Sequence, residues 1–162
     1  MEWAYIETIV HDMALHLAAY TDRAYETESV RHPLHVALSH MKLRERILVA
    51  KALAHEVPGD YYDRLAKLLN TIDSDLTIER NRYVHDSWDT DGNSVLRYAP
   101  GPKVVRPQAQ RRVLMMGTEK EFASLDEVRA FINRLLEARN SLVDLENELA
   151  GLMIAQDSLA GR

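Results

Sequence analysis

Residues 124–152 read SLDEVRAFINRLLEARNSLVDLENELAGL, and this stretch decides the fold class. Its apolar residues recur at alternating intervals of three and four positions, which is the period of one face of an α-helix. They are Val128, Phe131, Leu135, Ala138, Leu142, Leu145, Leu149 and Leu152. Residues 124–127 have the form of a capping box, in which a hydroxyl and a carboxylate bond the first amides of a helix. We therefore expect one long helix that packs in a bundle, followed by a frayed end over residues 155–162.

Three more helices are expected upstream of this one. The first covers about the first 20 residues, and the second runs from Pro33 to Val57, where Pro58–Gly59 breaks it. The third begins at Asp60, whose carboxylate is suited to cap it, and either continues or restarts through residues 77–88. The apolar stripes that predict these helices are Trp3, Ile6, Val10, Met13, Leu17 and Tyr20; Leu34, Leu38, Met41, Leu48 and Ala52; and Tyr62, Leu65, Leu69, Ile72 and Leu76.

Turn-forming residues are concentrated in one later segment. Of the six glycines and five prolines, six lie within residues 92–117. Short β-type runs at Ser94–Tyr98, Lys103–Arg106 and Arg111–Met116 predict a hairpin or a three-stranded meander there. The chain is thus predicted to be all-α, a four-to-five-helix up-and-down bundle. It is expected to form one domain over residues 1–162, with a small β-insertion at about 89–123.

The composition excludes several classes of function. The 162 residues include no cysteine, which rules out disulfides, thiol catalysis and cysteine-held metals. The net charge of -5 rules out a wholly basic nucleic-acid coat, and no apolar run is long enough for a membrane helix. Phosphate-loop and dinucleotide-binding motifs are missing from the sequence. We therefore expect a cytoplasmic protein without a membrane contact, a cofactor or a metal.

One stretch carries residues suited to catalysis. Residues 79–88 read ERNRYVHDSW and are polar where a bundle helix should be apolar. Asn81 and His85 are four positions apart and share a helix face, and the long side chain of Arg80 can reach the same point. A histidine moves protons near neutral pH, an arginine neutralises charge on phosphate oxygens, and an amide can orient the imidazole. The stretch therefore suits phosphodiester chemistry.

The spacing Arg80-Asn81-x-x-x-His85 resembles the R-x(4–6)-H motif of the HEPN superfamily, whose members are helical bundles common in bacterial toxin and defence systems. The resemblance implies a metal-independent endoribonuclease that works as a homodimer and joins two motifs across its interface. The resemblance is also compatible with an antitoxin or another protein as a partner. The aromatic residue Trp88, shortly after the histidine, is also similar to the pattern in small bacterial members of this superfamily. Asp86 instead stands where a glycine often follows the histidine, and two effects of its charge are open: it either raises the pKa of His85 or repels RNA.

A basic segment accompanies the motif. Residues 93–118 hold five basic residues and no acidic one, and together with Arg82 these are the expected RNA contacts. The five are Arg97, Lys103, Arg106, Arg111 and Arg112. An equally open interpretation is a charged hairpin whose basic residues protect the edges of the sheet from aggregation.

Two further groups of residues have a structural interpretation. The basic stripe on the second helix is expected to be a solvated face that pairs with the acidic last helix, rather than an RNA contact. It consists of Lys42, Arg44, Arg46 and Lys51. No Glu-x-x-His or His-Glu-x-x-His metal pattern occurs, so the scattered histidines are expected at the surface or at helix caps. They include His11, His16, His32 and His35.

Two functions other than RNA cleavage remain open. One is a non-catalytic module with the same fold that binds RNA or a protein. The other is a structural helical bundle in which the Arg80–His85 spacing is a coincidence.

Overall fold

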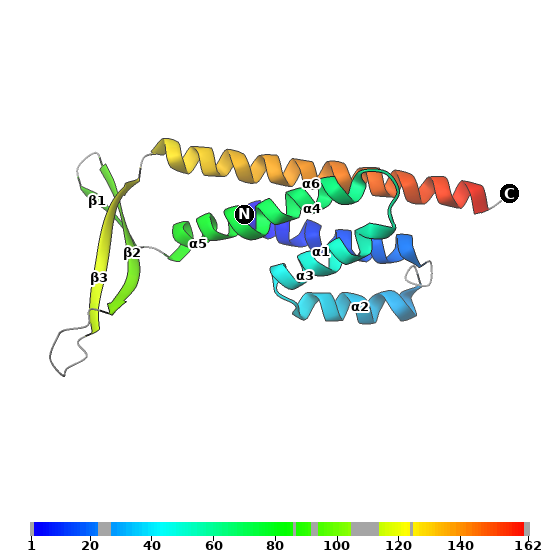
Figure 1. The fold of residues 1–162 in the computed structure, drawn as a ribbon, viewed down its shortest axis with the longest axis horizontal. Coiled ribbons are helices and arrows are strands. Elements are labelled where there is room, and N and C mark those ends of the chain that lie inside the picture. Colours follow the sequence, from blue (N-terminus) through cyan, green and yellow to red (C-terminus); the bar gives the residue numbers. More distant parts are fainter. Residues whose placement is uncertain are drawn as a thin grey trace. The chain divides into compact units, whose positions relative to one another are not determined.

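The fold is described from a computed structural model over residues 2–22, 27–85, 87–91, 94–104, 114–123 and 125–160. Its helices are α1 (Glu2–Thr21), α2 (Glu28–His40), α3 (Leu43–Leu53), α4 (Tyr61–Thr71), α5 (Thr77–His85) and α6 (Leu125–Ala160) (Figure 1). A 3₁₀ turn, Ala54–Glu56, follows α3, and a π-helical turn, Ile72–Leu76, joins α4 directly to α5. Residues 61–85 therefore form one uninterrupted helix. The predominance of helices confirms the prediction of a helical bundle.

The helices belong to two compact units. The first, here called the bundle unit, consists of Met1–Leu76 and Arg134–Arg162, and the second, the motif unit, of Thr77–Asn133. α6 contributes to both, because it begins in the motif unit and continues into the bundle unit. None of the helices in the described ranges combines the length and the apolar character needed to cross a bilayer.

The core of the bundle unit follows the predicted stripes. On α1, the stripe residues at positions 6, 10, 13 and 17 are fully buried. α4 contributes Leu65 and Leu69, and α6 contributes Leu142 and Leu149, all of which are inaccessible to solvent. Each such side chain stabilises the fold by roughly 2 kcal/mol relative to an exposed position. The three- and four-residue spacing thus marks the core faces of these helices correctly.

The prediction of one helix from Pro33 to Val57 is wrong, because two helices, α2 and α3, occupy this part of the chain. The chain leaves α2 at Met41, whose backbone is extended, and restarts at Leu43. Arg46 on α3 donates to the carbonyl oxygens of Leu38 and Ser39, at 2.8 and 3.3 Å, and so adds to the bond that the Met41 amide makes with Leu38 at the end of α2. No glycine or proline marks this break, which explains why the sequence pattern runs through it. Leu48, assigned to the buried stripe, is consequently exposed.

The ends of the later helices also differ from the prediction. Asp60 occupies the N-cap position of α4 but makes no capping hydrogen bond, because its carboxylate accepts from Arg64 instead. The expected capping box includes Ser124, which lies outside the described residues. The end of α6 is not frayed over residues 155–160, since the helix continues to Ala160.

Three strands lie between α5 and α6 in sequence. They are β1 (Ser87–Asp91), β2 (Ser94–Val104) and β3 (Leu114–Ala123), and they pair antiparallel in the order β1-β2-β3. β2 spans the first predicted run and the first two residues of the second, and it includes Pro100 and Pro102. Both prolines lie beyond the five residues that pair with β1, so among the described strands that part of β2 pairs with β3 alone. Such positions tolerate residues that lack a backbone donor.

Candidate functional site

The motif predicted from the sequence lies on α5, and two of its three residues are adjacent in space. Arg80 donates from Nη1 to Oδ1 of Asn81 at 3.1 Å. Asn81 is exposed, whereas Arg80 is half-buried. The backbone of His85 ends the helix, and its side chain, like the whole of Asp86, lies outside the described residues. The position of His85 four residues after Asn81 nevertheless puts both on one face of α5.

The bond between Arg80 and Asn81 is not specific to the motif. The same arrangement occurs on α6, where Arg139 donates to Oδ1 of Asn140 at 2.9 and 3.2 Å. Four residues after Asn140 the chain has Asp144 rather than a histidine. The histidine at this spacing therefore distinguishes the α5 site from an ordinary Arg–Asn contact.

The motif face of α5 is open to solvent. No residue of α5 between Thr77 and Val84 is fully buried. At about 100° per residue, Ile78 and Val84 lie on either side of Asn81, and each has 56% of its surface exposed. Arg82, the expected RNA contact, is also exposed on this side. The face thus presents a polar centre between two exposed apolar side chains.

Tyr83 fixes the opposite side of α5, a role that sequence analysis missed. Its ring stacks on that of Phe131, with centroids 4.7 Å apart and planes inclined by 27°. Phe131 is buried and belongs to the apolar stripe of α6. Tyr83 sits two residues after Asn81, so the stack holds the helix by the side remote from the motif. The signal was an aromatic residue inside an otherwise polar stretch.

The basic segment is only partly described. Arg97 and Lys103 lie on β2, whereas Arg106, Arg111 and Arg112 fall outside the described residues. The register places Arg97 opposite Glu121 of β3 and Trp88 of β1. The described strands carry three basic residues against four acidic ones, since β1 and β3 add carboxylates that the sequence window 93–118 left out. Their role as RNA contacts stays a prediction.

His11 is not a surface histidine, contrary to expectation. It is buried on α1, and its Nε2 lies 2.8 Å from Nδ1 of His35 on α2, so one ring donates a hydrogen bond to the other. Burial lowers the pKa of His11, and the charges of His35 and Arg46 lower it further. His16 pairs with Glu146 of α6 at 3.2 Å. Among the described residues, no three histidines or carboxylates come together as a metal site would require.

The expected pairing between the basic stripe and the acidic last helix is not met within the described chain. Arg44 lies 3.6 Å from Asp73, and Lys51 donates to Asn70 at 2.9 Å. Arg46 bonds the carbonyl oxygens at the end of α2. The acidic residues of α6 have other partners, because Glu146 contacts α1 and Glu148 contacts α4. The basic residues of α3 and the acidic residues of α6 therefore contact different neighbours.

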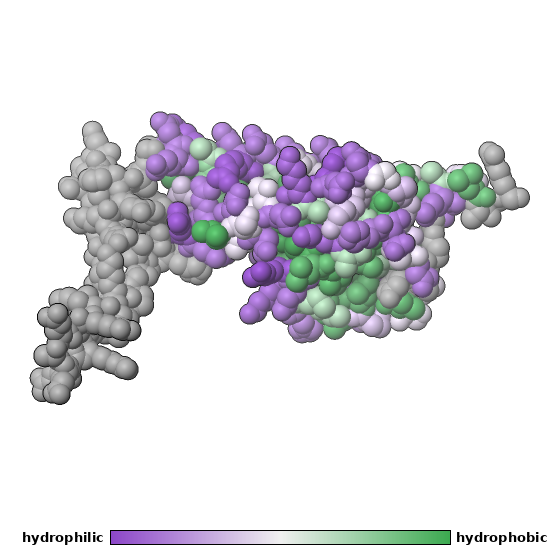
Figure 2. Space-filling view, viewed as in Figure 1, coloured by the Kyte–Doolittle hydropathy of each residue, from purple (hydrophilic) through white to green (hydrophobic). Residues whose placement is uncertain are grey.

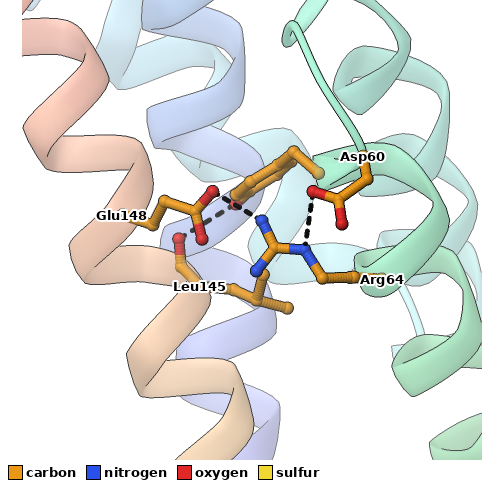
Figure 3. Close-up of polar contacts among 5 residues, drawn as sticks. Asp60, Arg64, Leu145 and Glu148 are labelled. Carbon is orange, nitrogen blue, oxygen red and sulfur yellow. Dashed lines mark hydrogen bonds and ion pairs between the residues drawn. The ribbon is translucent and has the colours of Figure 1, made fainter.

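A groove between α4 and α6 is the other candidate site. Arg64 lines it, with Nε 3.0 Å from Asp60 and Nη2 2.6 Å from Glu148, while the Tyr61 hydroxyl donates to the Leu145 carbonyl at 3.2 Å (Figure 3). The bond from Glu148 raises the pKa of Arg64, and burial raises the pKa of Tyr61. The cavity holds about 410 Å³ and is lined by Arg64, Lys67, Leu68, Thr71, Ser141, Asp144, Leu145 and Glu148. Two carboxylates, Asp144 and Glu148, balance the two cations, Arg64 and Lys67, so the lining has no net positive charge that would favour binding of a phosphate.

Comparison with known proteins adds no relative. No protein-family model matches the chain, and no curated protein or solved structure shows significant similarity to it.

Proposed function

We propose that the chain is a HEPN-like, metal-independent endoribonuclease of toxin or defence type that acts as a homodimer. The observation that carries this proposal is the Arg80–Asn81 pair on an exposed face of α5, followed at the fourth position by His85. The hydrogen bond occupies Oδ1 of Asn81 and leaves its Nδ2 group to donate to an imidazole nitrogen or a phosphate oxygen. Arg80, Asn81 and His85 would thus act together on one phosphodiester.

The mechanism needs two histidines and therefore two chains. The RNA 2′-hydroxyl attacks the adjacent phosphorus while His85 of one chain takes its proton. The bond from phosphorus to the 5′ oxygen breaks, and the second chain's His85 protonates that oxygen. The products are a 2′,3′-cyclic phosphate and a 5′-hydroxyl, and Arg80 of each chain stabilises the charge on the phosphorane.

The surroundings of the motif support association through α5. Ile78 and Val84 flank Asn81 and are exposed. A twofold contact between two such faces would bury these side chains and bring the two motifs together. Apolar residues beside a polar centre are what such an interface needs to exclude water from the reacting phosphate.

The test is cleavage of structured and unstructured RNA in excess EDTA by the parent and by His85→Ala. We expect the parent to leave cyclic phosphate ends and the variant to lose activity. His40→Ala serves as the matched control, because His40 is an exposed histidine at the end of α2 in the bundle unit. An RNA with 2′-O-methyl groups should resist cleavage, since it lacks the nucleophile.

Two other outcomes would contradict the proposal. RNA binding without cleavage would indicate a non-catalytic binding module. Neither binding nor cleavage would leave a structural bundle or a protein-binding role.

A further inference from the structure

Helix α2 is attached lightly to the rest of the bundle unit. Leu38 is the one buried residue among Glu28–His40, whereas α1 buries ten residues. α1 also packs more extensively against α3 than against α2, which lies at the margin of this unit (Figure 1). Val36 and Ala37 are exposed, and Figure 2 shows the apolar area that α2 and α3 leave outside the core. The position of α2 therefore depends strongly on its few polar contacts.

One of these contacts joins two histidine rings. Nε2 of His11, which is buried on α1, lies 2.8 Å from Nδ1 of His35, which is exposed on α2. The two rings meet edge to face, with their planes inclined by 88°. A hydrogen bond between two ring nitrogens needs a hydrogen on one and a lone pair on the other. At least one of the two rings must therefore be neutral for the contact to form.

The two protons that this pair can add have different effects on the contact. After the first proton, one ring is still neutral and its lone pair accepts the hydrogen bond. The positive charge can reside on His35, whose exposed ring is hydrated. A second proton leaves two N–H groups facing each other and two positive rings side by side, one of them buried on α1. The doubly protonated pair therefore opposes the docking of α2.

The surroundings of His11 increase this opposition. Burial lowers the pKa of His11, and the charges of His35 and of Arg46 on α3 lower it further. Asp12, the next residue on α1, raises this pKa, but its effect is the weakest of the four. On α2, the exposed residues Arg31–His32 lie one turn before His35 on the same face and add positive charge. The balance of charge around the pair is therefore unfavourable for a second proton.

We propose that the His11–His35 contact makes the docking of α2 on α1 sensitive to pH. α2 is docked while at least one of the two rings is neutral, and it is released when both rings are protonated. Arg46 bonds the carbonyl oxygens at the end of α2, so the released helix stays attached to α3. Since unperturbed histidines bind a proton below about pH 6.5, release occurs in mildly acidic solution. It does not involve the motif on α5 and is independent of RNA cleavage.

Amide hydrogen exchange of residues 28–40 tests the proposal, with the rates corrected for the effect of pH on intrinsic exchange. The released state binds one proton more than the docked state, so the equilibrium constant for opening of α2 should rise about tenfold between about pH 6 and pH 5. The amides of α4, Tyr61–Thr71, are the reference. Their opening constant should be at least about tenfold smaller at each pH, because release leaves α4 folded.

Substitutions of the two rings separate the contact from the simple burial of a histidine. His11→Gln supplies an amide that bonds His35 in either protonation state, so the rise should shrink to less than about twofold. His35→Asn supplies an amide near the position of Nδ1 and should reduce the rise to about threefold, because only the burial of His11 remains. His32→Asn is the matched control, since it makes the same exchange at an exposed position of α2 and should leave the tenfold rise unchanged.

Three outcomes would overturn the proposal. The first is an opening constant of α2 that does not rise in the parent as the pH falls. The second is an equal opening constant for α2 and α4, which would mean that α2 opens only when the whole bundle unit unfolds. The third is a His35→Asn variant that behaves as His32→Asn does, because the burial of His11 alone would then account for the effect of pH.

Discussion

α1 and α5 differ in how much of their sequence is buried in a core. α1 buries ten of its 20 residues, and its apolar stripe lies in the core of the bundle unit. α5 has no fully buried residue between Thr77 and Val84, and Tyr83 stacks on Phe131 on the side remote from the exposed Asn81. Packing therefore decides the sequence of α1, whereas α5 keeps polar side chains that packing does not require. Such residues are the ones to test for function.

The largest effect should come from the core of α1. Leu17→Ala removes a fully buried side chain and should lower the free energy of unfolding by about 3 kcal/mol. Ile78→Ala on α5 should change it by less than about 0.5 kcal/mol, because Ile78 is exposed. Urea denaturation at low protein concentration measures both. Equal losses of unfolding free energy in the two variants would contradict the conclusion that α1 is a core helix and α5 is not.

The next effect concerns activity rather than stability. Asn81→Ala should lower RNA cleavage about 100-fold, since it removes one positioned donor near the reacting phosphate. The unfolding free energy should stay within about 0.5 kcal/mol, because Asn81 is exposed. Asn140→Ala is the matched control, as it removes the same Arg–Asn bond on α6. If both variants lose activity equally, the effect does not belong to the motif.

The stack that holds α5 should contribute a smaller amount. Tyr83→Ala should lower the local opening free energy of α5 by about 1 kcal/mol, because the ring contact with Phe131 is lost. Amide hydrogen exchange of residues 77–85 measures this change. Tyr83→Phe keeps the ring and should retain most of the protection. Unchanged exchange in Tyr83→Ala would show that other contacts hold the helix.

The smallest effect should be a pH dependence that arises on α1. Burial lowers the pKa of His11 below 6.5, so the unfolded chain binds this proton more readily than the folded one. The contribution of neutral His11 to the free energy of unfolding is therefore fully present above about pH 6.5, and it is lost as the pH falls below that value. Urea midpoints between about pH 8 and pH 5 should fall less in His11→Gln than in the parent. His40→Gln, at an exposed position, should behave as the parent does.

The sequence predicted the elements whose apolar period is unbroken. On α1 four of the six predicted stripe residues are buried, and on α6 six of the eight are buried; the exceptions, which are half-buried, are Trp3, Tyr20, Val128 and Leu152. The boundary between α2 and α3 was missed, because it depends on Arg46 reaching carbonyl groups seven and eight residues earlier in the chain. A hydrogen bond of this kind leaves no periodic signal.

The same reasoning explains the result at the candidate site. The spacing of Arg80, Asn81 and His85 identified a helix face, and the structure adds that the face is exposed and that Arg80 bonds Asn81. The stack of Tyr83 on Phe131 joins residues 48 positions apart, and the contact of His11 with His35 joins two helices. Pairings over such distances follow from tertiary packing, which a single sequence does not reveal.

The division of α6 between the two units has a consequence for protein synthesis. The bundle unit needs residues 134–160, which the ribosome makes only after the whole motif unit. At about 5–20 residues per second, roughly 4–15 s separate residue 76 from Leu149. During that interval the nascent chain displays the apolar faces of α1 and α4 without the side chains of Leu142 and Leu149. A ribosome stalled after residue 133 would therefore carry a chain whose bundle unit still lacks Leu142 and Leu149, a state in which chaperones have apolar surface to bind.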